Sequence, residues 1–185
     1  MEVLALIPAR ANSKSIKLKN MQILKGKPLI YYTIMSALNS KRITRTIVSS
    51  ESTKILNYSK NKVEIIKRPK KLSRDNSPTL DVVIHCLRYL KKKENYNPDI
   101  LVILQPTSPF RKGSDIDTAI KLLEEDKKSD CLVSVQRVPH NFEPYSQMVL
   151  NKKGYLKNLI KQKKLKIRKQ DKLITYSRNG AAIYV

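Results

Sequence analysis

The hydrophobic pattern alternates between short, continuous apolar runs and longer segments with one apolar face. The runs predict strands at residues 3–7, 46–48, 63–66, 100–104 and 132–135. The first run is too short for a membrane span and too continuous for a half-exposed strand, so it predicts a strand buried in a parallel sheet. Residues 100–104 predict the central strand of that sheet.

Segments with helical spacing lie between these runs. They predict helices over residues 28–39 and 52–60, and another after Asn76 or Ser77, either of which is a suitable N-cap before Pro78. The apolar stripe of this third helix is formed by Leu80, Val83, Ile84, Leu87 and Leu90. Ser114 and Asp117 have the spacing of a capping box for a fourth helix that ends near residue 126. The alternation predicts an α/β protein with a doubly wound, mostly parallel sheet.

The alternation stops at Pro139. Residues 140–175 are polar, strongly basic and only weakly periodic, and an excursion of this length in a compact domain is usually functional, disordered or an oligomer contact. Residues 181–185 resemble another strand. Because the chain then stops inside it, we expect a single domain over residues 1–185 that lacks a C-terminal portion.

Charge is the unusual feature of the composition: 38 basic residues stand against 15 acidic ones, for a net charge of +23. Such a balance is compatible with nucleic-acid binding, with a solvated lysine-rich surface, or with an enzyme that uses a few of the cations to hold a polyanion. The sequence has no recognised nucleic-acid motif and no Trp, so we expect no nucleic-acid partner. Cys86 and Cys131 are far apart, and the N-terminus lacks the basic region of a signal peptide. These features predict a cytoplasmic protein without a membrane anchor.

Four polar clusters follow predicted strands. They are the opening loop at residues 8–20, the basic segment 68–75 with the turn at 76–79, the loop 105–111, and the segment 176–184. The carboxyl ends of parallel strands meet at one edge of an open α/β sheet, which is where ligands bind in such folds. The opening loop lacks the glycine patterns of the common phosphate loops, so Arg and Lys side chains would have to hold an anion there.

These clusters resemble the acylneuraminate cytidylyltransferases, the CMP-sialic acid synthetases. The matching motifs are Ile7-Pro-Ala-Arg-Ala-Asn-Ser-Lys14, Leu18-Lys-Asn20, Arg68-Pro69, Ser77-Pro-Thr79, Gln105-Pro-Thr-Ser-Pro-Phe-Arg111, Arg168-Lys-Gln-Asp171 and Asn179-Gly-Ala181. The resemblance covers essentially the whole chain and implies a nucleotide-diphospho-sugar transferase-like fold. It also implies a dimerisation arm in residues 140–175, and hence a homodimer.

The resemblance further implies a reaction and a set of roles. The anomeric hydroxyl of a sialic-acid-like nonulosonate would attack the α-phosphate of CTP, and pyrophosphate would leave. Lys19 and Arg168 would be the catalytic cations, with Arg168 at the leaving end. Nucleotide and sugar contacts would come from Arg10, Ser13, Asn20, Arg68, Ser77, Thr79, Gln105 and Asn179.

Mg²⁺ is the implied cofactor, although the Asp-x-Asp segment that binds it in the family would lie beyond residue 185. No metal ligand is therefore assigned within the sequence, and we expect weak or no turnover from these 185 residues alone. Two alternatives stay open. The acceptor could be 3-deoxy-manno-octulosonate, since related cytidylyltransferases share the first loop, or the protein could be a basic polyanion-binding module without catalytic activity.

Overall fold

The computed structural model describes residues 1–13, 16–74, 76–160, 174–179 and 183–184. They belong to two compact units, which are treated separately below. Unit 1 comprises Met1–Ser134 and Gly180–Val185, and unit 2 comprises Val135–Asn179. The predicted excursion at residues 140–175 falls within unit 2.

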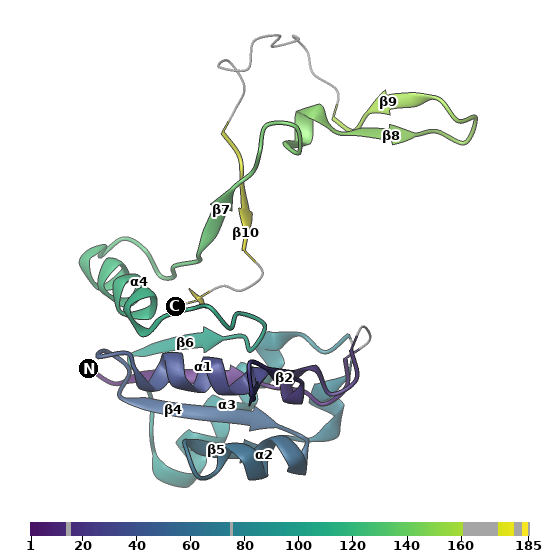
Figure 1. Ribbon diagram of the computed structural model, residues 1–185. Coiled ribbons are helices and arrows are strands. Elements are labelled where there is room, and N and C mark those ends of the chain that lie inside the picture. Colours follow the sequence, from purple (N-terminus) through teal and green to yellow (C-terminus); the bar gives the residue numbers. More distant parts are fainter. Residues whose placement is uncertain (14–15, 75, 161–173, 180–182, 185) are drawn as a thin grey trace. The chain divides into compact units, whose positions relative to one another are not determined.

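Unit 1 is built on a five-stranded sheet with the order β11-β6-β1-β4-β5 (Figure 1). Four of its strands are parallel: β1 (Val3–Pro8), β4 (Arg45–Ser50), β5 (Glu64–Lys67) and β6 (Ile100–Leu104). The short β11 (Ile183–Tyr184) pairs antiparallel with β6. The prediction of a mostly parallel α/β sheet is therefore confirmed.

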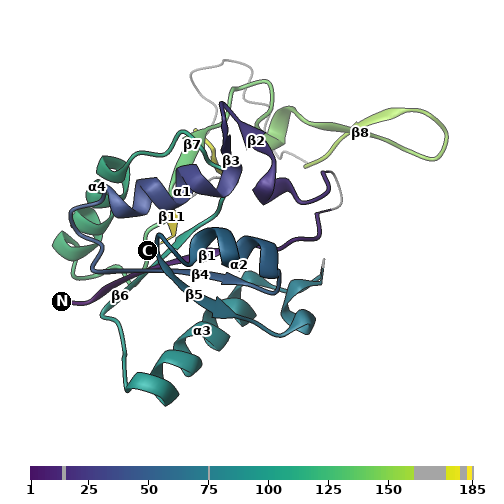
Figure 2. The same cartoon turned by 60° about the horizontal axis from the view of Figure 1, so that its bottom comes forward.

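Helices cover both faces of this sheet (Figure 2). The first face carries α1 (Leu29–Leu38), α2 (Thr53–Ser59) and α4 (Gly113–Glu125), and the second carries α3 (Thr79–Glu94). Successive side chains of a strand point to opposite faces. Accordingly, Ala5 and Ile7 of β1 pack with the first set of helices, whereas Leu4 and Leu6 pack with α3.

β1 is the centre of the core. Its residues from Val3 to Ile7 are fully buried, and burying each large aliphatic side chain stabilises the fold by about 1.5–3 kcal/mol. Pro8 is in register with Ser49 of β4, and Ser50 is in register with Lys67 of β5. The loops that follow these strands therefore start at one edge of the sheet.

A 3-10 helix and a β-hairpin precede α1. The 3-10 helix η1 (Lys19–Met21) starts after Leu18, whose backbone is left-handed at φ 51°. The strands β2 (Ile23–Leu24) and β3 (Lys27–Pro28) form a hairpin whose turn residues, Lys25 and Gly26, both have positive φ. Such a turn matches the right-handed twist of its strands. A further 3-10 helix, η2 (Lys70–Ser73), follows β5.

The predicted helix caps were wrong in two places. Pro78 precedes α3, and the Ser77 hydroxyl donates instead to the carbonyl oxygen of Lys71 at 2.9 Å. α4 begins at Gly113, where a Cβ atom would lie 2.5 Å from the carbonyl oxygen of Asn39. The N-cap is Lys112, whose backbone N–H donates to the carboxylate of Asp115 at 2.8 Å, so Asp115 rather than Ser114 caps the start of α4. Asp117 does not cap α4, because it accepts hydrogen bonds from the N–H groups of Lys41 and Arg42.

Unit 2 consists of two antiparallel ribbons and a 3-10 helix. β7 (Val135–Arg137) pairs with β10 (Tyr176–Arg178), and β8 (Met148–Leu150) pairs with β9 (Leu156–Asn158), with η3 (Pro144–Ser146) between β7 and β8. The predicted strand at 132–135 is therefore not a strand of the parallel sheet. The regular strand starts at Val135, where the apolar run ends, and its described partner is β10 of the same unit.

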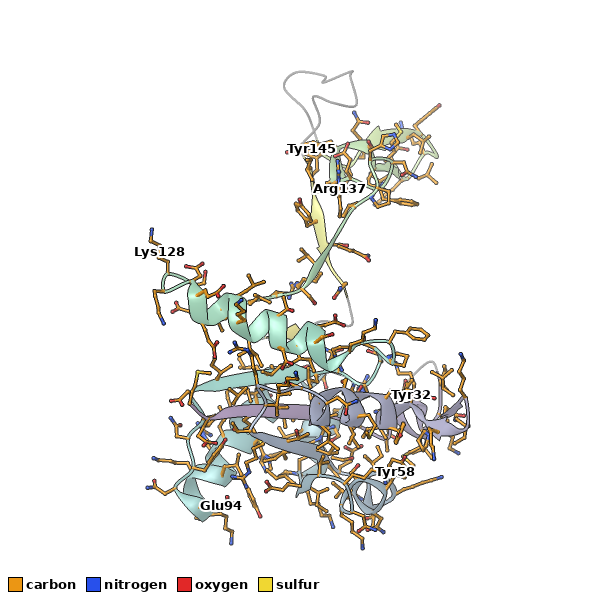
Figure 3. All side chains as sticks on the ribbon, turned by 60° about the vertical axis from the view of Figure 1, so that its left-hand side comes forward. Tyr32, Tyr58, Glu94, Lys128, Arg137 and Tyr145 are labelled. Carbon is orange, nitrogen blue, oxygen red and sulfur yellow. The ribbon has the colours of Figure 1, made fainter. Side chains whose placement is uncertain are left out.

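Most side chains on the β7–β10 and β8–β9 ribbons are exposed, and Figure 3 labels Arg137 of β7 among them. Many of them are large, apolar and exposed, and the β8–β9 hairpin carries several. Among the described residues of the whole chain, no helix has both the length and the apolar character needed to cross a bilayer.

Candidate functional site

A cavity of about 330 Å³ lies in unit 1 at the carboxyl edge of the sheet. Its walls come from the loops after β1, β5 and β6, from η1, and from the first turn of α3. The lining residues are Pro8, Arg10, Ser13, Lys19, Asn20, Arg68, Leu72, Arg74, Ser77, Thr79, Val82, Gln105, Pro106 and Thr107. This volume is within the usual range of small-ligand pockets.

Eight of the ten predicted site residues line this cavity: Arg10, Ser13, Lys19, Asn20, Arg68, Ser77, Thr79 and Gln105. They come from four separate parts of the sequence, and the parallel strands bring them together. Arg168 lies outside the described residues. Asn179 belongs to unit 2, so its predicted role at the cavity stays a prediction.

The loop after β1 is held in place by Asn20. This residue is 6% exposed, and its amide nitrogen donates to the carbonyl oxygen of Arg10 at 2.9 Å. The guanidinium of Arg10 contacts the segment after β5, because its Nη1 lies 3.4 Å from the carbonyl oxygen of Arg74. Asn20 therefore orients Arg10, in addition to presenting its own side chain to the cavity.

Arg68 is an unusual cavity residue because it is 4% exposed. Its Nε donates to the hydroxyl of Ser73 at 2.8 Å, and its Nη2 forms an ion pair with Glu51 at 3.2 Å. Burial lowers the pKa of Arg68, and the nearby carboxylate of Glu51 opposes that shift. Since an arginine starts from a pKa above 12, the guanidinium stays charged, and Glu51 balances this charge.

The start of α3 forms another wall. Thr79 is its first residue and Val82 lies one turn later, so both side chains face the cavity. The first N–H groups of a helix have no partner within the helix and carry a partial positive charge. A 16-residue helix that begins at this wall therefore favours an anion in the cavity.

The loop after β6 is fixed by its own last residue. Arg111 is buried, and its Nη2 lies 3.1 Å from the carbonyl oxygen of Gln105 and 3.3 Å from the hydroxyl of Thr33 on α1. Burial lowers the pKa of Arg111 to about 10, although the charge of Asp115 works in the opposite direction. Gln105 thus enters the cavity from a loop that is anchored to α1.

Sequence reasoning missed several residues of the site. Leu72, Arg74, Pro106 and Thr107 lie in segments that were singled out, but no role was assigned to them. Val82 could have been found from its spacing of three residues from Thr79, which places both on one face of α3. Glu51 was also missed, although a polar residue directly after a central strand is a recognisable signal in a parallel sheet.

The charge of the cavity limits its ligand. Its described lining includes the four cations Arg10, Lys19, Arg68 and Arg74, together with hydroxyl and amide groups, and contains no carboxylate. Arg and Lys side chains with helix N–H groups are the usual partners of phosphates. The fold and this cavity together define an α/β protein with a polyanion site at the carboxyl edge of its sheet.

The chain belongs to the cytidylyltransferase family, whose model, described as "Cytidylyltransferase", matches residues 4–185. It is 34% identical over 137 residues to an N-acylneuraminate cytidylyltransferase of Escherichia coli, covering 74% of this chain and 32% of that protein. It is 37% identical over 136 residues to a CMP-N,N'-diacetyllegionaminic acid synthase of Legionella pneumophila, covering 72% and 58% respectively. The chain thus spans less than two thirds of either relative.

A solved structure with a similar fold is a CMP:2-keto-3-deoxy-manno-octonic acid synthetase complexed with CTP. The TM-score is 0.73 at 18% sequence identity, and the match covers 100% of this chain and 73% of that one. At this identity the likeness concerns the fold alone.

Proposed function

We propose that this protein transfers CMP from CTP to the anomeric hydroxyl of a nonulosonate sugar and releases pyrophosphate. The observation that carries the proposal is the convergence of eight family-motif residues on one cationic cavity, whose described lining residues include no carboxylate. Family membership supports the nucleotidyl transfer, and the names of the E. coli and Legionella relatives support a nonulosonate acceptor.

In the proposed step, the sugar hydroxyl oxygen bonds to the α-phosphorus while the bond from that phosphorus to the bridging oxygen breaks. The electron pair leaves with pyrophosphate, and the hydroxyl proton passes to solvent, because the described cavity lining holds neither a carboxylate nor a histidine. Negative charge grows on the pyrophosphate as it leaves. Arg10 and Lys19 would stabilise this charge, and fixed cations that meet developing charge are a large source of rate enhancement.

Positioning of the acceptor would fall to Gln105. Its amide can both donate and accept a hydrogen bond, which suits the hydroxyl and carboxylate groups of a sugar acid. The anchoring of its loop through Arg111 keeps this amide at the cavity wall. Placing two reactants side by side removes much of the entropic part of the barrier, so an anchored loop suits the proposed transfer.

The described residues do not fit a protein-held Mg²⁺ ion. Hard cations of this kind prefer carboxylate and other oxygen ligands. The described lining of the cavity has no carboxylate, and no group of three His, Cys, Asp or Glu side chains suited to a metal occurs among the described residues. We therefore assign no step of the reaction to a metal, and the magnesium requirement stays a prediction.

A homodimer is the second part of the proposal. Unit 2 exposes large apolar side chains on its hairpin, including Leu150 and Leu156, which face each other across β8 and β9. Exposed apolar groups gathered on one segment often mark a contact with another protein surface. A second copy of the chain is the partner that we propose for this hairpin.

A substrate panel tests the proposed reaction. Each of the four nucleoside triphosphates is mixed with N-acetylneuraminate, a legionaminate, a pseudaminate or 3-deoxy-manno-octulosonate, and pyrophosphate is measured. We expect release only from CTP and only with a nonulosonate. Release only with 3-deoxy-manno-octulosonate would reassign the acceptor.

Direct binding distinguishes the enzyme from a non-catalytic basic module. CTP should bind more tightly than the other three nucleotides by isothermal titration, and Lys19→Met should weaken this binding. Lys92→Met, a matched loss of charge at an exposed position on α3, should leave CTP binding unchanged. Equal, salt-sensitive binding of all four nucleotides and of RNA would instead indicate a polyanion-binding module.

A further inference from the structure

Glu51 is a mostly buried carboxylate that is not part of the cavity lining. It is the first residue after β4, and its side chain is 11% exposed. Its Oε1 accepts from the backbone N–H of Ala11 at 2.7 Å. Its Oε2 accepts from the hydroxyl of Ser73 at 2.6 Å and from Nη2 of Arg68 at 3.2 Å. One side chain thus connects the loop after β1 with the segment after β5.

We propose that Glu51 is a positioning residue for the nucleotide: its carboxylate sets the spacing of the cavity's arginines before the ligand binds. The inference rests on the proposed function, because it takes the ligand to be CTP. No motif of the family resemblance described above includes Glu51, and its carboxylate would repel phosphates if it faced the cavity.

Glu51 contacts the sequence neighbours of two cavity-lining arginines. Arg10 precedes Ala11, and Arg74 follows Ser73, so each oxygen of Glu51 holds the residue next to a cavity-lining arginine. The hydrogen bond from Arg10 to the carbonyl oxygen of Arg74 connects the same two segments on the cavity side. The two segments are therefore joined both through Glu51 and at the cavity wall.

Glu51 itself has little freedom to move. The backbone before it is fixed in the sheet, because the N–H of Arg68 donates to the carbonyl oxygen of Ser50 at 3.0 Å. The backbone after it enters α2, where the hydroxyl of Ser52 accepts from Ile55 as the helix N-cap. A carboxylate fixed at both of its backbone neighbours can impose its geometry on the more irregular loops that it holds.

Charge explains why a carboxylate suits this position. Arg68 is almost fully buried, and a buried cation is tolerated only when it is paired and hydrogen-bonded. The carboxylate of Glu51 balances the charge of Arg68, and it also accepts hydrogen bonds from the N–H of Ala11 and the hydroxyl of Ser73. A glutamine would keep the shape, but it would lose the negative charge and place an N–H₂ group among donors.

The test compares Glu51→Gln with Glu64→Gln. Glu64 also accepts from an arginine, Arg45, but it lies on β5 away from the cavity lining, so its variant controls for the loss of an ion pair. We expect Glu51→Gln to weaken CTP binding by about 10- to 100-fold, the effect expected when hydrogen bonds to a charged group are lost. Glu64→Gln should bind CTP within about twofold of the wild type.

Steady-state kinetics separate positioning from a general loss of structure. For Glu51→Gln the KM for CTP should rise while the KM for the sugar acid stays constant, and Glu51→Asp should restore part of the CTP affinity. A parallel rise in both KM values, or wild-type CTP binding by Glu51→Gln, would overturn the proposal. If Glu51→Gln does not fold, Ser73→Ala provides a similar comparison, because it removes the two hydrogen bonds that join the Ser73 hydroxyl to Glu51 and Arg68 and leaves both charges in place.

Hydrogen exchange measured without ligand tests the positioning role of Glu51 independently of the proposed function. We expect the amides of residues 9–13 and 68–73 to exchange faster in Glu51→Gln than in the wild type, and those of β6 to be unchanged. If the wild type fails to bind CTP but this difference is observed, the proposed function fails while the positioning role of Glu51 holds. Unchanged exchange in both segments would overturn the positioning role, whatever ligand the cavity binds.

Discussion

Arg111 holds Gln105 in place: its Nη2 atom lies 3.1 Å from the Gln105 carbonyl oxygen, so the last residue of the loop after β6 fixes the first. The same nitrogen contacts the hydroxyl of Thr33 on α1 at 3.3 Å. A cation at this buried position therefore connects a cavity residue with the core helix that packs behind it.

The first prediction concerns this contact. Arg111→Met should destabilise the protein by about 1–3 kcal/mol, because a buried acceptor on Thr33 and a partly buried one on Gln105 lose their donor. It should also raise the KM for the sugar acid more than the KM for CTP, since Gln105 is the proposed sugar contact. Urea unfolding and pyrophosphate assays measure the two effects, with the exposed Lys112→Met as the control. Wild-type stability together with a wild-type KM for the sugar would contradict the prediction.

The second prediction is a loss of stability in acid that depends on Glu51. Burial alone raises the pKa of this carboxyl, but the hydrogen bonds from Ser73 and Ala11 and the charge of Arg68 outweigh burial, so its net pKa is below the ordinary value. A depressed pKa contributes stability that is fully present above the unfolded-state pKa, about 4.3 for Glu. This contribution is lost as the pH falls through the folded-state pKa.

Urea midpoints of the wild type and Glu51→Gln, measured from pH 7 to pH 3, test this. The gap in stability should be constant above about pH 5 and should narrow below the unfolded-state pKa of about 4.3, because the unfolded chain then binds a proton that the folded carboxylate resists. Asp117 also has a lowered pKa, because its bonds from Ser40, Lys41 and Arg42 outweigh its burial. It is present in both proteins and cancels from the comparison. A gap that stays constant to pH 3 would refute the prediction.

The third prediction tests the start of α4. Gly113→Ala should destabilise the protein by about 1–3 kcal/mol, because the added Cβ would lie 2.5 Å from the carbonyl oxygen of Asn39 and 2.7 Å from the nitrogen of Ser40. The adjacent Ser114→Ala should change the stability by less than about 0.5 kcal/mol. A cost of about 1 kcal/mol for Ser114→Ala would instead support a helix cap at Ser114. Thermal or urea unfolding distinguishes the two results.

The fourth prediction concerns association through the β8–β9 hairpin. Leu150 and Leu156 form a cross-strand pair and are 68% and 62% exposed. Replacing both with serine should convert the proposed dimer to a monomer in light scattering, while the unfolding of unit 1 stays unchanged. Lys157→Ser alters the same strand at its neighbouring position and should leave the dimer intact. A wild-type protein that is monomeric at working concentration would rule out this use of the hairpin.

Sequence reasoning succeeded where the signal was local. The unbroken apolar run from Val3 to Ile7 is enough to predict a central strand, because few other environments accept five such residues in succession. The convergence of Arg10, Arg68 and Gln105 on one cavity also followed from the sequence, since parallel strands direct their following loops to a common edge.

The features that sequence reasoning missed are contacts between distant segments. The hydrogen bond from Ala11 to Glu51 joins two loops that follow different strands, and no local pattern encodes it. The start of α4 was misplaced because its cap is the pair Lys112 and Asp115, whereas the sequence spacing pointed to Ser114 and Asp117. The segment 132–135 was assigned to the parallel sheet because periodicity identifies a strand but not its partner.

The pairing of β11 with β6 has a consequence for the newly made chain. β6 exposes one row of backbone donors and acceptors to solvent until residues 183–184 arrive, and these follow the whole of unit 2 in the sequence. An unpaired strand edge can recruit strands from other molecules. We therefore expect the pairing of β11 with β6 to cover an edge that could otherwise pair with another chain.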